Sequence, residues 1–379
     1  MGDEQGDCLP LIRGRSRPSV LPWLIVDGGG RRMAGSDGKE KSWRTVAKSG
    51  IALLALCLLF LSAASSSHAD SLLYLRIGTG PPGESYFPIG GLIASAISNP
   101  PGAPPCDRGG SCGVPNVIAA ASATTGSVSN ALAIGNGSLD VALMQADVAL
   151  WASRGQAPFQ NRPIANLRSV ANLYANQLHL VARADARIAS PGNLKGKRIS
   201  LGAQGSGTLV HARQILAAWN LKESDVSASF LPSAVAADAM RAGRIDAFFV
   251  VDGAPVPSIA ELAKAFPIVL VPIDGSGAEK LRNADALLRP ANIPADTYDG
   301  VSKDVATLQI GVDLVVSADL PGELVFAITK ALWHPHTALL FREGPPQAAL
   351  LTPSLATIDL GPPLHPGALR FYTETGLLQ

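Results

Sequence analysis

The sequence predicts an α/β protein of two lobes, in which each lobe is a mostly parallel sheet flanked by helices and two strands cross between the lobes. Short apolar strands alternate with helical patterns, which indicates βαβ units. A strand end, a small polar turn that contains glycine and a helix start recur together in both halves of the chain. Two long extended apolar stretches, Leu167–Asp185 and Asp304–Pro321, are candidate crossing strands.

The N-terminal elements follow from apolar runs and the turns between them. A buried strand runs from Leu72 into a glycine-rich turn, and Pro88 is tolerated in the first turn of the helix that follows. A second strand ends at a polar turn, Ala123–Gly137, which opens another helix. In order, we expect a helix over Tyr86–Ser98, strands over Val114–Ser122 and Val141–Met144, and a helix from near Asp147.

The C-terminal elements repeat this order. We expect helices over Leu209–Trp219 and Gly322–Trp333, the second as the terminal helix, and strands over Ala247–Val251 and Phe266–Asp274. The crossing stretches divide the chain into lobe 1, residues 70–176 and 310–379, and lobe 2, residues 177–309. The hinge is expected near Asn176 and Gly311.

Length and composition limit the classes of partner. The chain has 379 residues, which is enough for two lobes with sizeable cores. It is 47% hydrophobic and 16% charged, with a formal net charge of +1. A nucleic-acid partner normally shows as a basic patch or stripe, and this composition indicates none. The sequence therefore favours a small-molecule ligand, and we expect the protein to be a monomer.

The N-terminus predicts export to the periplasm. Ile51–Ala64 is an uncharged apolar run with lysines and an arginine before it and small residues at Ser67 and Ala69 after it. This pattern is typical of a secretory signal, cut after Ala69. A retained anchor is the alternative, although a membrane-spanning helix needs about 20 residues. Residues 1–32 lack periodicity, and Met33 is the expected true start.

Two of the four cysteines, Cys106 and Cys112, follow the predicted cut. They stand six positions apart in a Gly/Pro-rich loop of a chain bound for an oxidising compartment, so we expect a disulfide. A metal site would need further Cys or His at metal-site spacing, and none is near in the sequence. No metal or cofactor is therefore expected.

The turn Gly205-Ser206-Gly207-Thr208 offers backbone N–H groups and hydroxyls at a helix N-terminus, which favours an anion. A P-loop would have Lys after its last glycine, and a dinucleotide fingerprint has G-x-G-x-x-G rather than the G-x-x-G-x-G found from Gly202. A carboxylate is therefore favoured over a phosphate. A plain tight turn with a Ser/Thr cap is the alternative.

Other candidate ligand residues lie at the equivalent turns. Tyr86 follows the first turn, Thr125 and Ser127 lie in the second, and Gln145 ends a strand. Asp252 is a lone acid at a strand end, which either caps the next helix or holds a ligand ammonium. No H-E-x-x-H or G-x-S-x-G motif is present and the histidines are scattered, so we expect no enzyme.

Together the motifs "LRIGTGPPGESYFPIGG", "ATTGSVSNALAIGNGSLDVALMQADVALWA", "LKGKRISLGAQGSGT", "GRIDAFFVVDGAPVP", "IPADTYDG" and "LHPGALRFY" resemble the TAXI family of TRAP-transporter solute-binding proteins, from about Leu73 to Tyr372. The resemblance implies a two-lobed periplasmic binding protein of type II topology. Such a protein captures a small organic anion, often glutamate or a related C4/C5 dicarboxylate, and delivers it to TRAP membrane permease subunits.

The resemblance also implies ligand positions, and the matching residues here are Tyr86, Thr125, Ser127, Gln145, Ser206, Gly207, Thr208, Gly253 and Pro255. Asp252 departs from the small apolar residue usual in the family and suits an amino-acid ligand. The Cys106–Cys112 insertion and the "HPGA" motif at His365–Ala368 have no explanation at this level. A protein that serves a membrane sensor, or an enzyme on the same two-lobed fold, is the alternative.

Overall fold

The computed structural model describes residues 71–378. The predicted signal peptide, its cut after Ala69, the Met33 start, Cys8 and Cys57 lie outside the described residues. Among the helices of residues 71–378, none combines the length and the apolar character needed to cross a bilayer.

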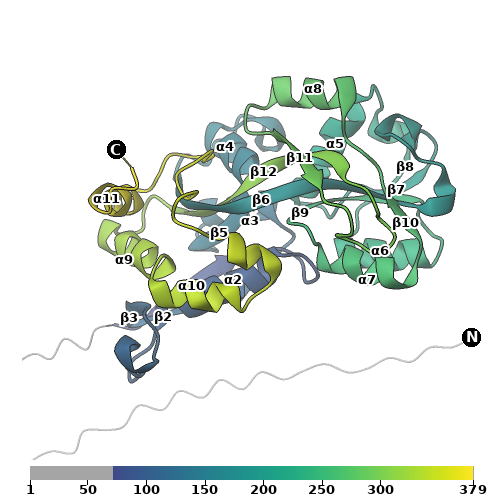
Figure 1. The fold of residues 1–379 in the computed structure, drawn as a ribbon. Coiled ribbons are helices and arrows are strands. Elements are labelled where there is room, and N and C mark those ends of the chain that lie inside the picture. Colours follow the sequence, from purple (N-terminus) through teal and green to yellow (C-terminus); the bar gives the residue numbers. More distant parts are fainter. Residues whose placement is uncertain (1–70, 379) are drawn as a thin grey trace, which may run out of the picture. The chain divides into compact units, whose positions relative to one another are not determined.

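A mixed sheet of twelve strands organises the described chain (Figure 1). In its first half, β1 (Leu73–Gly78) pairs in parallel with β4 (Val117–Ser122) and β5 (Val141–Gln145). The second half repeats this pattern, because β7 (Arg198–Ser200) pairs in parallel with β8 and β9, which cover Ser227–Ser229 and Ala247–Asp252. The predicted α/β class, with a parallel core in each half, is confirmed.

Two long antiparallel strands run from one half to the other through the centre of Figure 1. β6 (Leu167–Arg183) pairs with β12 (Val305–Ser317) in the first half and with β9 and β10 (Ile268–Leu270) in the second. β12 pairs with β5 at one end and with β11 (Arg289–Ile293) at the other. The predicted crossing strands are therefore confirmed.

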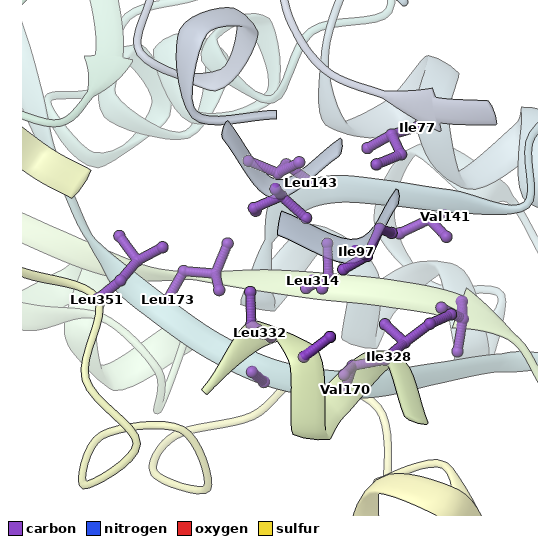
Figure 2. Packing of buried hydrophobic residues seen from close by; sticks show 14 of the residues in the cluster. Ile77, Ile97, Val141, Leu143, Val170, Leu173, Leu314, Ile328, Leu332 and Leu351 are labelled. Atoms are coloured by element: carbon purple, nitrogen blue, oxygen red, sulfur yellow. The ribbon is translucent and has the colours of Figure 1, made fainter. Parts of the chain in front are cut away.

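Helices cover the first half of the sheet. Its core joins the crossing strands to α9, and Figure 2 shows Leu173 and Leu314 on those strands near Ile328 and Leu332 of α9. All four side chains are buried. The helices of this half are α2 (Tyr86–Ile97), α3 (Ser127–Gly135), α4 (Ala146–Arg154), α9 (Gly322–Leu332), α10 (Pro335–Arg342) and α11 (Pro366–Glu374).

The second half packs helices on both faces of its strands. Phe248 and Phe249 of β9 lie in different hydrophobic clusters, because successive residues of a strand face opposite sides. Phe248 packs in one cluster with Met240 of α6, and Phe249 packs in the other with Leu216 of α5. The helices are α5 (Gly207–Ala218), α6 (Ser233–Arg241), α7 (Pro257–Ala265) and α8 (Gly275–Ala284).

The expectation that Gly322–Trp333 forms the terminal helix is wrong, because α10 and α11 follow it. The unexplained "HPGA" motif starts α11. The Nδ1 atom of His365 accepts a hydrogen bond from the amide of Gly367 at 3.1 Å and so caps the helix. A Cβ on Gly367 would lie 2.2 Å from the carbonyl oxygen of Gly322, so glycine lets α11 pack closely against α9.

Candidate functional site

The two predicted anion-binding turns face each other across the halves. The amide of Ser129 in α3 donates to the carbonyl oxygen of Gly205, which precedes α5, at 3.0 Å. A Cβ built on Gly126 would lie 3.4 Å from Cα of Ser206, and one on Gly205 would lie 2.8 Å from Oγ1 of Thr125. The N-termini of α3 and α5 therefore meet in direct contact.

Beside this contact, four buried polar residues of the first half and its crossing strand form a network. Oγ of Ser127 accepts from the amide of Gln145 at 3.1 Å, and Nδ2 of Asn176 donates to the hydroxyl of Tyr86 at 3.2 Å. Burial, followed by the charge of Asp252, raises the pKa of Tyr86, so its hydroxyl keeps its proton. Sequence reasoning placed Asn176 at the hinge and not at the site.

The network touches the second half through Gln145. A Cβ on Gly207 would lie 1.7 Å from Oε1 of Gln145, so only glycine allows this approach. Oε1 of Gln145 and Oδ1 of Asn176 are buried and have no hydrogen-bond partner within residues 71–378. Buried acceptors of this kind are costly unless a donor reaches them.

Helix N-termini give the site its electrostatic character. The first turns of α3 and α5 contain no acidic residue, whereas α4 has Asp147 in its first turn. Each helix N-terminus carries a partial positive charge of about half a unit. Two such ends that face each other favour an anion at their junction.

Asp252 bridges the halves at a different helix. Its carboxylate accepts from the amide of Ser85 at 2.7 Å, from the Ser85 hydroxyl and from the amide of Gly253 at 2.9 Å. Ser85 is the N-cap residue of α2, so Asp252 caps a helix of the first half rather than the helix that follows it in sequence. Burial raises the pKa of Asp252, and burial together with the charge of Asp252 raises the pKa of the neighbouring Glu84.

A second charged cluster also joins the halves, and the sequence did not indicate it. Oδ2 of Asp147 in α4 lies 3.1 Å from Nε2 of His211 in α5, and both side chains are buried. Asp285, which follows α8, is the third member. Burial and then the charge of Asp147 raise its pKa to about 6. Burial opposes the charged form of His211, but Asp147 outweighs it and raises the pKa of His211.

The hydroxyls of the α5 turn make hydrogen bonds within the second half. Oγ of Ser206 donates to the carbonyl of Ala203 at 2.7 Å and accepts from the amide of Leu209 at 3.1 Å, so Ser206 is the N-cap residue of α5. Oγ1 of Thr208 accepts from the amide of Val251 at 3.1 Å. The hydrogen of the Ser206 hydroxyl is therefore already used, whereas the Thr208 hydroxyl and the backbone N–H groups of this turn are candidate donors to a ligand.

Gly253 and Pro255 make contacts with the first half. Nε2 of Gln347, in the 3-10 helix η6 (Pro346–Leu350), donates to the carbonyl of Gly253 at 2.7 Å and of Pro255 at 2.9 Å. Gln347 was missed because it lies in a segment whose sequence pattern indicated no element. These contacts hold the halves together beside Asp252.

The predicted disulfide between Cys106 and Cys112 is present. No histidine stands at metal-site spacing from this pair along the sequence, but two histidines lie close to it in space. His334 and His336, at the start of α10, offer ring nitrogens within 4.8 Å of the two sulfur atoms and of each other.

Comparison with known proteins shows which protein family this chain resembles. A model of the family described as NMT1-like matches residues 77–376. Among solved structures, similar chains include the alkanesulfonate-binding protein SsuA from Xanthomonas axonopodis pv. citri bound to MOPS (16% identity, 82% of this chain and 96% of that chain, TM-score 0.42). Another is the periplasmic aliphatic sulphonate binding protein SsuA from Escherichia coli (13% identity, 79% of this chain and 78% of that chain, TM-score 0.38). A third is an ABC transporter periplasmic binding protein from Brucella ovis with glutathione bound (15% identity, 70% of this chain and 68% of that chain, TM-score 0.38).

Proposed function

The chain belongs to the NMT1-like family, and we propose that it is a periplasmic solute-binding protein that closes two lobes around a small carboxylate. The lobes are residues 70–176 with 310–379 and residues 177–309. The hinge lies where Asn176 pairs with Ile310 and Gly311 pairs with Ala175, because there both crossing strands leave the first half. Binding shifts the population from open to closed lobes.

One observation carries this proposal. The N-termini of α3 and α5 come from different halves and meet at the contact between Ser129 and Gly205. Neither helix has an acidic residue in its first turn to neutralise its positive end. A carboxylate at this junction would accept from backbone N–H groups of both lobes, so it binds the closed form more tightly than the open form.

The neighbouring side chains indicate what else the ligand carries. Oε1 of Gln145 and Oδ1 of Asn176 are buried acceptors without a partner inside residues 71–378. A ligand hydroxyl, amine or amide would satisfy them. Asp252 is already engaged by Ser85 and Gly253, so a ligand ammonium, as in glutamate, would meet Gln145 and Asn176 first.

The finer assignment is a TAXI-type subunit that delivers glutamate or a related C4/C5 dicarboxylate to a TRAP permease. The motif resemblance supports it. Delivery to a membrane sensor would use the same binding site, and reconstitution with the permease subunits in vesicles separates the two. Ligand uptake that requires this protein supports the transport role.

Thermal unfolding of the purified protein tests the site directly. The panel holds amino acids, C4 and C5 dicarboxylates, monocarboxylates, alkanesulfonates, sugars and nucleotides. A ligand at 100 times its dissociation constant adds about 2.7 kcal/mol to the free energy of unfolding. We expect a carboxylate to raise the melting temperature and to be recovered unchanged after incubation. Stabilisation by nucleotides alone contradicts the proposal, and recovery of a converted ligand favours the enzyme.

Gln145→Ala tests whether the ligand binds at the junction of α3 and α5. It should weaken binding of the carboxylate by about 1–3 kcal/mol, because a hydrogen bond between buried groups is lost. Gln156→Ala, at an exposed position just after α4, is the matched control and should bind like the native protein. Equal affinities of the two variants would place the ligand elsewhere.

A further inference from the structure

Four side chains with metal-binding atoms gather at the far end of the first half, away from the α3–α5 junction. Cys106 and Cys112 lie on the loop between β2 (Ser98–Asn99) and β3 (Val114–Pro115). His334 and His336 flank Pro335 at the turn from α9 to α10. One atom from each of the four side chains lies within 4.8 Å of the other three.

The backbone holds the cysteine loop in place without help from the disulfide. β2 pairs with β3, so both ends of the loop are fixed. Inside the loop, the amide of Gly110 donates to the carbonyl of Pro105 at 3.0 Å. A Cβ on Gly110 would lie 1.7 Å from the carbonyl oxygen of Pro104, so the loop closes tightly at a glycine. The two thiols therefore stay near each other when the disulfide is reduced.

The histidines are fixed by the helix turn. Oγ1 of the buried Thr337 donates to the carbonyl of Ala331 at 2.7 Å and ties α10 to the end of α9. Nδ1 of His336 lies 3.2 Å from Sγ of Cys112 and 3.9 Å from Sγ of Cys106. Nδ1 of His334 accepts from the amide of His336 at 3.2 Å, and a metal at that nitrogen would replace this hydrogen bond.

We propose that Cys106, Cys112, His334 and His336 form a Zn²⁺ site when the disulfide is reduced. Two thiolates and two imidazoles are a donor set that Zn²⁺ binds tetrahedrally at about 2.0–2.3 Å, which places ligand atoms about 3.3–3.8 Å apart. The observed cluster reaches that spacing with small side-chain movements once the S–S bond opens. Ca²⁺ and Mg²⁺ are excluded because they require oxygen ligands.

Sequence spacing could not reveal this site. C-x5-C and H-x-H differ from the C-x2–4-C and H-x3–5-H spacings of zinc fingers, and about 220 residues separate the two pairs. Only the packing of β3 and α10 around the end of α9 brings the pairs together. Partial exposure of the four side chains gives an ion direct access from solvent.

The chemistry is a two-electron exchange coupled to metal binding. A dithiol reductant breaks the S–S bond by thiol–disulfide exchange, becomes a disulfide itself and leaves two thiols on the protein. Zn²⁺ then binds both sulfurs and displaces their two protons. A two-electron oxidant restores the disulfide and releases Zn²⁺. In an oxidising compartment the disulfide is the resting form, so the site loads only where a dithiol reductant acts.

Metal titration of the purified protein tests the proposal, with no polyhistidine tag on the chain. The protein is reduced with a dithiol under argon, desalted and titrated with Zn²⁺ against a chromophoric chelator. We expect one Zn²⁺ per reduced chain and none at this site in the oxidised protein. Co²⁺ should give thiolate-to-metal charge-transfer absorption in the reduced protein only. Equal Zn²⁺ binding by both redox forms, or Co²⁺ spectra without thiolate bands, overturns the proposal.

Variants identify the ligands. His336→Ala should weaken Zn²⁺ binding by more than the about 10–100-fold that loss of an outer-sphere partner costs, while the disulfide still forms on oxidation. His336→Cys should restore binding because it supplies a third thiolate. Arg342→Ala, exposed on the same helix, is the control and should bind Zn²⁺ like the native protein. Native affinity in both His336→Ala and the double variant Cys106→Ser/Cys112→Ser excludes the site.

Discussion

Two buried carboxylates, Asp252 and Asp147, bridge the halves of the molecule in different ways. Asp252 accepts from two amides and one hydroxyl, all from Ser85 and Gly253. Oδ2 of Asp147 lies 3.1 Å from Nε2 of His211 without hydrogen-bond alignment, and neither atom has another hydrogen-bond partner within residues 71–378.

The difference lies in what neutralises each charge. Backbone and hydroxyl donors hold Asp252 at the N-terminus of α2, and these donors do not titrate. Asp147 depends on His211 and on Asp285, which both titrate. A buried ion pair without full hydrogen bonding contributes little net stability, because desolvation offsets the attraction. Both contacts change with pH: the Asp252 cap through the carboxyl of Asp252 itself, whose folded pKa is about 6, and the contact between Asp147 and His211 through the partners His211 and Asp285.

The largest expected effect on stability comes from removing the Asp252 carboxylate. Asp252→Ala should lower the free energy of unfolding by about 3–5 kcal/mol, because it leaves buried donors of Ser85 and Gly253 without an acceptor. Urea denaturation measures the loss. Asp238→Ala, exposed on α6, is the control and should change stability by less than about 0.5 kcal/mol. A small loss in Asp252→Ala would mean that water replaces the carboxylate.

The charged cluster of Asp147, His211 and Asp285 should make the free energy of unfolding depend on pH. Asp285 has a folded pKa of about 6 against an ordinary value of 3.8, so the folded state keeps a proton that the unfolded state loses between these values. Through Asp285, the free energy of unfolding should therefore fall as pH rises from about 4 to 6, by about 1–2 kcal/mol after allowance for solvent screening. Asp252, whose folded pKa is also about 6, adds to the fall in the same range. The raised pKa of His211 has the same sign but acts above the ordinary value of 6.5, because the stability it adds is lost as pH rises through its folded pKa.

Asp285→Asn isolates this contribution. The decline of stability between pH 4 and 6 should become shallower than in the native protein, as followed by urea denaturation at each pH. Asp274→Asn, exposed at the other end of α8, should keep the native profile. Parallel curves for native protein and Asp285→Asn would show that Asp285 is already ionised throughout this range.

The sequence predicted the elements that carry local signals, but not the contacts that the two carboxylates make between the halves. The crossing strands were predictable because Leu167–Asp185 and Asp304–Pro321 are long, apolar and extended. The turns at Ser127 and Ser206 were predictable because glycine and hydroxyl residues gather between a strand and a helix. Such signals are local and need no knowledge of contacts.

Partners across the halves could not be predicted, since 167 residues separate Ser85 from Asp252 and no local pattern connects them. α8 was missed for a different reason. Its sequence, GSGAEKLRNA, buries only Gly277, Ala278 and Leu281, so its apolar stripe is too thin to recognise. Asp285 was missed with it because its environment exists only once α8 packs against α5.

A finer test of the junction removes a single oxygen. Tyr86→Phe keeps the ring and deletes the hydroxyl that Asn176 contacts, so it should weaken binding of the carboxylate by about 0.5–1.5 kcal/mol. Tyr74→Phe is the matched control, because Tyr74 is 64% exposed on β1. Calorimetric titration of both variants measures the difference. Native affinity in Tyr86→Phe would mean that this hydroxyl only orders Asn176.

The smallest expected effect concerns Ser206. Its sequence context suggested a ligand contact, whereas its hydrogen bonds make it the N-cap residue of α5. Ser206 caps α5, so Ser206→Ala should lower the free energy of unfolding by about 1 kcal/mol. Its effect on ligand affinity should stay within about twofold, because the hydroxyl already donates to Ala203 and leaves binding to the other donors of this turn. Loss of affinity with unchanged stability would reverse that assignment. The Ser206 hydroxyl would then donate to the ligand instead of to Ala203. Its contact would depend on whether the ligand is bound, as the contact of Asp147 depends on the protonation of His211.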